Sequence, residues 1–164
     1  MNEFVKIGYV SHPHGIKGEI RLISNFELKN IIFTPGFKVY FGDNHDEFII
    51  TGYRRHKHFD MITLEGITDI NQILKYKKES VYIKRSHLGL KKDDHLISDL
   101  YNMAVYENDE FLGKIEDVVY NKANILLKID GVKYFYIPYN EQYITSVDLN
   151  KRIIKTKGAK ELII

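Results

Sequence analysis

Residues 8–21 of this 164-residue chain read Gly8-Tyr9-Val10-Ser11-His12-Pro13-His14-Gly15-Ile16-Lys17-Gly18-Glu19-Ile20-Arg21. We predict that a strand ends at His12, because Pro13 has no N–H group for a further ladder hydrogen bond. Two glycines three residues apart then allow a tight change of chain direction before the next strand starts at Glu19. The stretch therefore predicts two strands joined by a compact turn.

Two interpretations of this turn stay open. In the first, it is a well-built structural β-turn. In the second, it displays His14, Lys17 and Arg21 near one rim of a barrel, where they meet phosphates or the carboxylates of a partner. The residues of the turn are compatible with both.

Outward from this turn, the first half of the chain consists of short runs rich in β-branched and aromatic residues, separated by Gly, Asn or Asp. The predicted strands are Phe4–His12, Glu19–Ser24, Phe37–Phe41, Glu47–Arg55, Met61–Glu65 and Ser80–Lys84. One helix interrupts them, with Asp69 as its N-cap and Gln72 three residues later. Its buried face is expected to consist of Ile70, Ile73 and Leu74. Six strands favour a small closed barrel, and we expect the helix to plug one of its ends.

The stretch 85–94 breaks this pattern and gathers charged residues and glycine, as a linker does. We expect an N-terminal domain over residues 1–88, a linker over 89–94 and a second domain over 95–164. The strands predicted beyond the linker are Met103–Glu107, Phe111–Tyr120, Asn124–Asp130, Val132–Ile137, Ile144–Asp148 and Arg152–Thr156. A two-residue type I′ turn is expected at Asp130-Gly131, since it needs positive φ at both positions, and Asn108-Asp109 is expected to be another turn. The fold class is therefore predicted as all-β, with two small barrels.

Composition sets limits on function. Hydrophobic residues make up 44% of the chain, enough for packed cores, and there is no cysteine, which excludes disulfides and thiolate metal sites. No apolar run approaches the ~20 residues that span a bilayer, and residues 1–6 lack the basic flank and apolar stretch of a secretory signal. We expect a cytoplasmic protein without membrane contact.

The net charge of +2 is too small to identify a nucleic-acid binder by itself. The basic excess lies in the first half: residues 1–88 contain 13 Lys and Arg against 10 Asp and Glu, and residues 89–164 contain 11 against 12. Any contact with RNA is therefore expected in the first half.

The pattern Gly-x-Val-x-x-x-His-Gly-Ile-x-Gly-Glu-x-Arg within residues 8–21 resembles the motif that opens the RimM family of ribosome maturation factors. Further stretches are similar to the end of that family's N-terminal domain: Arg54-Arg55-His56-Lys57, Leu64-Glu65-Gly66-Ile67 and Ile70-Asn71-Gln72. In the second half, four stretches resemble the PRC-barrel domain of the same family: Asp99-Leu100, Leu112-Gly113-Lys114-Ile115, Ile137-Pro138-Tyr139 and Val147-Asp148-Leu149. The resemblance covers nearly the whole chain.

The resemblance implies a six-stranded barrel like those of translation factors, followed by a PRC barrel, and an accessory role without catalysis, cofactor or metal. Family members associate with the immature small ribosomal subunit and its RNA, support processing of that RNA and maturation of the subunit head, and bind the head's ribosomal protein S-nineteen. We expect a monomer, because a factor that supports the assembling particle has to fit a single site on it.

For phosphate contacts we expect Arg21, Arg54, Arg55 and Lys57, in addition to the turn residues His14 and Lys17. Tyr53 and Phe59 are the expected stacking faces for exposed RNA bases. The alternative for residues 54–57 is an ordinary solvated strand end.

The second domain departs from the family pattern at several positions. The family usually carries two aromatic residues just before the Asp-Leu pair, where this chain has His95-Leu96, and glycines where it has Asn102 and Glu161. We expect partner contacts from His95, Leu96 and Tyr139.

The run Tyr134-Phe135-Tyr136-Ile137 adds two more candidate contacts. Strand alternation buries either Phe135 and Ile137 or the two tyrosines, and the other set covers an inter-domain or partner surface. Tyr134 and Tyr136 are therefore the further contact residues expected in this domain.

Two other functional classes stay open. His12 with His14, and His56 with His58, alternate along strands as metal ligands of a hydrolase could, although the chain has no His-Glu-x-x-His helix, no Gly-x-Ser-x-Gly elbow and no complete phosphate loop. A barrel adaptor that binds protein alone is the second class, and its binding would not depend on salt as RNA binding does.

Overall fold

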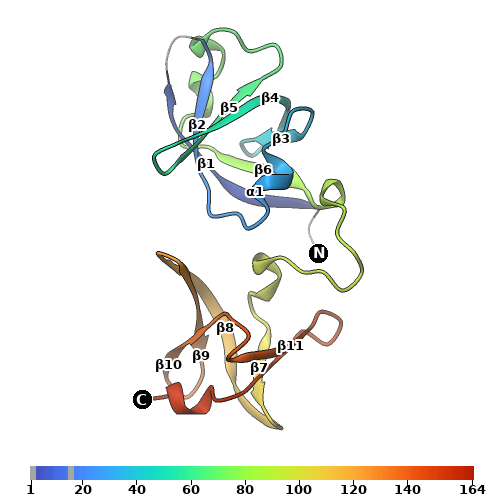
Figure 1. The fold of residues 1–164 in the computed structure, drawn as a ribbon, viewed down its shortest axis with the longest axis vertical. Helices are drawn as coiled ribbons and strands as arrows, with labels where there is room; N and C mark the ends of the chain where they lie inside the picture. Colours follow the sequence, from blue (N-terminus) through green and yellow to red (C-terminus); the bar gives the residue numbers. More distant parts are fainter. Residues whose placement is uncertain (1–2, 15–16) are drawn as a thin grey trace. The chain divides into compact units, whose positions relative to one another are not determined.

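The structure, a computed structural model, describes residues 3–14 and 17–164, and the side chains of Pro13 and His14 lie outside that description. The chain divides into two compact units, Met1–Lys91 and Lys92–Ile164. Each unit contains one six-stranded sheet (Figure 1).

The first unit is a closed barrel with the strand order β1-β2-β5-β4-β3-β6. Its strands are β1 (Phe4–His14), β2 (Glu19–Ile23), β3 (Lys38–Phe41), β4 (Asp46–His56), β5 (Phe59–Leu64) and β6 (Ser80–Lys84). Alternation of buried residues is clear in β2, where Ile20 and Leu22 are buried between partly exposed neighbours. The predicted six-stranded barrel is confirmed.

Gly8 is required where β1 crosses β2. The pairing of β1 with β6 shifts register between Lys6 and Gly8, and at Gly8 the β1 backbone lies against the end of β2. A Cβ atom on Gly8 would lie 2.1 Å from the carbonyl oxygen of Ile23 and 3.0 Å from Cβ of Ser24. The first glycine of the motif is therefore needed for close backbone approach.

A short helix that the sequence did not predict follows β2. Helix α1 (Lys29–Ile32) lies in the connection to β3, and it buries Ile32 completely and the following Phe33 almost completely. With four residues, it is too short to show a helical repeat of apolar positions. Its packing against the barrel brings Lys29 close to the strands.

The helix predicted after Asp69 is instead two 3₁₀ turns, η1 (Ile70–Gln72) and η2 (Leu74–Tyr76). The predicted cap is confirmed: the Asp69 carboxylate accepts from the N–H of Asn71, and the Gln72 side chain accepts from the N–H of Asp69. Ile73 lies between the turns with φ −121° and ψ 2°, outside the helical range, so no continuous helix forms.

Which residues these turns bury also differs from the expectation. Ile73 is buried and Ile70 partly so, but Leu74 is 49% exposed. Tyr76 takes the expected place of Leu74 in the core, where its ring meets Phe41 and Phe48 edge-on and its hydroxyl donates to Asp46 at 2.7 Å.

The buried Tyr76 hydroxyl should make the first unit sensitive to alkali. Burial and the Asp46 carboxylate raise the pKa of Tyr76 from 10.0 to about 12. The unfolded chain therefore ionises first, so the stability from this group is present below about pH 10 and is lost as the pH rises toward about 12. Tyr76→Phe should be less stable than the parent by about 1 kcal/mol at neutral pH. Denaturant unfolding should show this gap closing as the pH rises, and a gap independent of pH would contradict the assignment.

The second unit contains a six-stranded sheet with the order β10-β9-β8-β7-β12-β11. Its strands are β7 (Ala104–Glu107), β8 (Glu110–Asn121), β9 (Asn124–Asp130), β10 (Tyr134–Pro138), β11 (Ile144–Asp148) and β12 (Ile153–Thr156). All pairs are antiparallel except β12 with β7, which run parallel from Ile153 opposite Ala104 to Thr156 opposite Glu107. The last strand of the chain therefore lies inside the sheet.

The hairpin between β9 and β10 exists, but its turn differs from the predicted one. Tyr134 pairs with Asp130, so the loop consists of residues 131–133 and not of a two-residue type I′ turn. Gly131 does not have a positive φ, and a Cβ atom on it would lie 2.1 Å from the Leu112 carbonyl oxygen. Close approach to β8 explains this glycine. The Asn108-Asp109 turn is confirmed, with Glu107 paired to Glu110 and Asn108 at φ 54°.

Three 3₁₀ helices complete the chain: η3 (Arg85–Leu88), η4 (Ile97–Leu100) and η5 (Lys160–Leu162). The Asp99-Leu100 pair has a structural role in η4, because the buried Asp99 carboxylate accepts from the N–H of Leu96 and Leu100 is fully buried. Within the described part of the chain, none of the helices is long and apolar enough to cross a membrane.

Candidate nucleic-acid interface

Five of the candidate RNA residues of the first unit lie on three neighbouring strands, β2, β5 and β4: Arg21, Tyr53, Arg54, Arg55 and Phe59. Arg21 and Arg54 both pair with Met61, and Arg55 pairs with Asp60. Because side chains alternate along a strand, Arg54 and Arg55 point to opposite faces of the sheet. The two arginines therefore cannot contact the same phosphate as one cluster.

Arg54 lies on the outer face in a two-pronged ion pair with Glu19. Its Nη2 and Nε lie 2.7 Å and 2.8 Å from the two Glu19 oxygens, and hydrogen bonding to Glu19 raises the pKa of Arg54. The motif residue Glu19 therefore fixes the guanidinium and neutralises its charge. An RNA phosphate would have to compete with Glu19 for Arg54.

Arg21 lies on the same outer face and covers the ring of Phe59. The centre of its guanidinium is 4.5 Å from the ring centroid, within the range of a cation–π contact. Phe59 also packs against His58, with ring centroids 4.0 Å apart. The Phe59 ring, expected to stack on RNA bases, is thus already in contact with two side chains.

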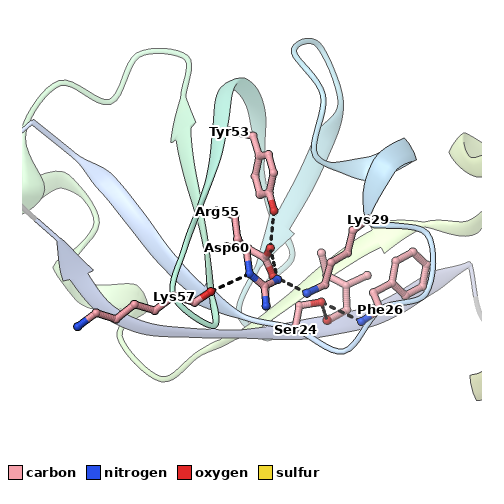
Figure 2. Close-up of polar contacts among 8 residues, drawn as sticks. Ser24, Phe26, Lys29, Tyr53, Arg55, Lys57 and Asp60 are labelled. Carbon is pink, nitrogen blue, oxygen red and sulfur yellow. Dashed lines mark hydrogen bonds and ion pairs between the residues drawn. The ribbon is translucent and has the colours of Figure 1, made fainter. Parts of the chain in front are cut away.

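Asp60 organises the inner side of the same strands. Its carboxylate has no exposed surface and contacts three side chains (Figure 2): it accepts hydrogen bonds from the Tyr53 hydroxyl at 2.6 Å and from Arg55 Nη1 at 3.1 Å, and it forms an ion pair with Lys29 Nζ at 2.8 Å. Arg55 Nη1 contacts Oδ1 and Lys29 Nζ contacts Oδ2. Asp60 also pairs across the ladder with the buried Leu22. A buried carboxylate needs such partners, because an unpaired one would be strongly destabilising.

The segment before α1 holds Lys29 in place. The buried Ser24 hydroxyl donates to the carbonyl of Ile7 and accepts the N–H of Phe26 at 3.1 Å (Figure 2). These bonds tie the chain that leaves β2 to β1. Helix α1 therefore starts at a fixed place, from which Lys29 reaches Asp60.

Tyr53 is part of this network. Its ring stacks on Phe33 with centroids 5.0 Å apart and an interplanar angle of 4°. Burial, and then the hydrogen bond to Asp60, raise the pKa of Tyr53. One ring face is occupied by Phe33, so Tyr53 offers at most its other face to a base.

Two of the remaining candidates, Lys57 and Lys17, lie in turns. Lys57 occupies the β4–β5 turn at φ 56°, with its side chain exposed and its carbonyl accepting from Arg55 Nε at 3.0 Å. Lys17 is exposed in the turn before β2. Leu22, which pairs with Asp60 of β5, lies toward the opposite end of β2. The side chain of His14 lies outside the described residues.

The sequence did not single out three charged residues of this region: Lys29, Asp60 and Glu19. Lys29 lay in the stretch between the predicted strands Glu19–Ser24 and Phe37–Phe41, and Asp60 lay immediately before the predicted strand Met61–Glu65. A carboxylate next to a turn is also typical of solvent-exposed residues. The run of basic residues at 54–57 was the one signal in the sequence for a charged partner such as Asp60. Among the described residues, no group of three or more His, Asp or Glu could hold a metal ion.

In the second unit, alternation along β10 buries Phe135 and Ile137 and leaves Tyr134 and Tyr136 about half exposed. Tyr134 donates to Glu116 at 3.2 Å, and Lys128 Nζ lies 4.5 Å from its ring centroid. The hydrogen bond to Glu116 raises the pKa of Tyr134. The two tyrosines share one outward face of the sheet.

His95 and Tyr139 form a second candidate contact region. His95 Nε2 lies 2.6 Å from the Tyr139 hydroxyl, beside a hollow of about 270 Å³ that is also lined by Ile144 and Val147. Leu96 is fully buried. The expectation of a surface contact from Leu96 does not fit this position, because its backbone N–H is held by Asp99 and its side chain faces the core.

Comparisons with known proteins cover both units. The family model described as RimM N-terminal domain matches residues 5–88, and the model described as RimM PRC barrel domain matches residues 97–162. Two curated relatives carry the name ribosome maturation factor RimM. The one from Staphylococcus aureus is 34% identical over 93% of this chain and 95% of its own length, and the one from Staphylococcus epidermidis is 31% identical over 97% and 98%. A solution structure of the RimM N-terminal domain from Thermus thermophilus is 21% identical, with a TM-score of 0.46, and covers 54% of this chain and 98% of that one.

Proposed function

The chain belongs to the RimM family of ribosome maturation factors, and from this premise we propose that it binds the immature small ribosomal subunit and supports maturation of its head and processing of its RNA. Both domains of the family are matched, and the curated relatives match nearly end to end. This two-domain match is the observation that carries the proposal.

The protein acts by binding and performs no catalysis of its own. A factor that binds the partly assembled particle more tightly than its misfolded or finished forms increases the population of that state, by no more than its differential affinity. Cofactors and metals have no part in this mechanism. The factor leaves once the head has matured, and it works as a monomer in the cytoplasm.

The first unit provides the RNA contact. Arg55, Lys57 and Lys17 carry exposed cationic groups there, and Arg21 and Arg54 lie on the outer face with Phe59 between strands β2 and β4. Lys and Arg side chains bind backbone phosphates without reading sequence. Such contacts suit a factor that must recognise the shape of a folding RNA.

The second unit provides the protein contact, with ribosomal protein S-nineteen of the head as the partner. Tyr134 and Tyr136 offer apolar area with polar tips on one face, while His95 and Tyr139 flank the hollow beside β11. Tyrosine at such positions is typical of protein interfaces.

Co-sedimentation with small ribosomal subunits tests this function. The wild-type protein should migrate with free small subunits on a sucrose gradient and be absent from joined ribosomes. Arg55→Gln should weaken the affinity for small subunits roughly tenfold, because one phosphate contact is lost. The fraction of protein that migrates with the subunits should fall accordingly. Since Arg54 is neutralised by Glu19, Arg54→Gln should weaken binding less.

A salt titration separates this function from the protein-only adaptor. Binding of RNA should weaken steeply with salt concentration, with a slope set by the number of phosphates contacted. A wild-type protein that stays at the top of the gradient at every salt concentration would remove the proposed function. Binding that is insensitive to salt would favour the adaptor.

A further inference from the structure

We propose that Lys29 and Arg55 together bind one RNA backbone phosphate at the barrel end next to the β4–β5 turn, and that Asp60 is the positioning residue of this site. The proposal rests on the proposed function, since it names the contact through which the first unit holds RNA. Its ligand class is a phosphodiester.

The geometry brings two cations from different elements to one carboxylate. Lys29 comes from α1 and Arg55 from β4, and they bind the two oxygens of Asp60 at 2.8 Å and 3.1 Å (Figure 2). Asp60 is completely buried, whereas the side chains of Lys29 and Arg55 are 26% and 50% exposed. Asp60 therefore holds the two cations from the inside, and their outer surfaces are open to a ligand.

Both cations keep donors for such a ligand. A guanidinium has five N–H donors and an ammonium has three. In the contacts described, Arg55 uses Nε for the Lys57 carbonyl and Nη1 for Asp60, and Lys29 uses one bond to Asp60. Both heads contact the same carboxylate, so the remaining donors belong to one small region of the surface. Two cations against one carboxylate also leave a net positive charge, which attracts an anion.

Stability alone is a weak reason for this arrangement. Removing a carboxylate from water is costly, and apolar residues of similar size often stabilise a core as well as a buried ion cluster does. The Tyr53 hydroxyl and one cation would already supply Asp60 with partners. Holding a second cation at the rim is what a phosphate site requires, because a fixed pair of cations needs little ordering when the ligand binds.

Asp60→Asn tests the positioning role through the sign of its effect. Removing a negative charge near an RNA site strengthens binding if only the overall field matters. If Asp60 positions the cations, Asp60→Asn should instead weaken binding of a short fluorescent single-stranded RNA at least about fivefold in anisotropy titrations, despite the gain in positive charge. Glu47→Gln is the matched control. It removes an exposed carboxylate paired to Lys38 in the same barrel and should leave the affinity equal or higher.

A double-mutant cycle tests whether the two cations share one phosphate. Lys29→Gln and Arg55→Gln should each weaken RNA binding, and the loss in the double variant should be smaller than the two losses combined. The salt slope of the double variant should fall by about 0.7, the value for one phosphate on a single strand. Additive losses with a fall of about 1.4 would mean two separate phosphates and overturn the shared site.

The remaining outcomes are also decisive. Unchanged affinity in Asp60→Asn, or tighter binding, overturns the positioning role, and if that variant does not fold, the cycle on Lys29 and Arg55 still decides the site. If the wild-type protein binds small subunits and all these variants bind equally well, only the proposed phosphate site is excluded. If the wild-type protein does not bind small subunits, the proposed function itself is contradicted.

Discussion

Gly8→Ala should unfold the first unit or lower its free energy of unfolding by at least about 3 kcal/mol, the upper end of what overpacking costs. The new Cβ would lie 2.1 Å from the Ile23 carbonyl oxygen. No rotamer change can relieve a contact with backbone, so β1 and β2 would have to separate at the point where the Ser24 hydroxyl joins them. Denaturant unfolding followed by circular dichroism measures the loss.

Gly52→Ala is the matched control in the same barrel. A Cβ atom on Gly52 would meet only the hydroxyl oxygen of Thr63, at 2.8 Å, and that side chain can rotate away. We expect a change within about 1 kcal/mol, helped by the lower entropy of alanine in the unfolded chain. Equal losses in the two variants would show that close approach of β1 to β2 is not what Gly8 provides.

Asp60→Ala should lower the free energy of unfolding by about 1–3 kcal/mol, because it leaves two partly exposed cations and a tyrosine hydroxyl without their common partner. Loss of the Asp60 contact should cost most at Lys29 and Tyr53, since these side chains are less exposed to solvent than Arg55. Chemical denaturation of the full chain, analysed for the transition of the first unit, measures this change. A loss below about 1 kcal/mol would mean that solvent replaces Asp60 easily.

An apolar replacement of the whole cluster separates stability from RNA binding. The triple variant Lys29→Met, Arg55→Met and Asp60→Leu should recover most of the stability lost in Asp60→Ala, because no charge is left unpaired. It should still bind RNA weakly. Recovery of both properties would contradict the role of the cluster as a binding site.

Strand content could be read from the sequence because alternation and turn residues are local signals. The six strands of the first barrel and the Asn108-Asp109 turn are examples, and in β10 alternation limited the core to one of two sets, of which the structure selects Phe135 and Ile137. The cap at Asp69 followed from two residues three positions apart. Each of these features depends on residues close together in the chain.

The parts that sequence reasoning missed depend on contacts between distant residues. Lys29 meets Asp60 only because α1 packs on the barrel, and a helix of four residues has no readable periodicity. The sequence predicted phosphate contacts from both Arg54 and Arg55, but strand alternation places these adjacent residues on opposite faces. Gly131 suited a type I′ turn by residue type, but its contact with the Leu112 carbonyl, which belongs to β8, decides its role.

The position of β12 has a consequence for synthesis of the chain. Every strand of the first barrel is complete at Lys84, so this unit can fold while the rest is still being translated. The second sheet cannot do so, because β12 (Ile153–Thr156) must insert between β7 and β11. Its formation waits until Thr156 has left the ribosome. The first unit, for which we propose RNA binding, is therefore complete before the second unit, for which we propose the protein contact.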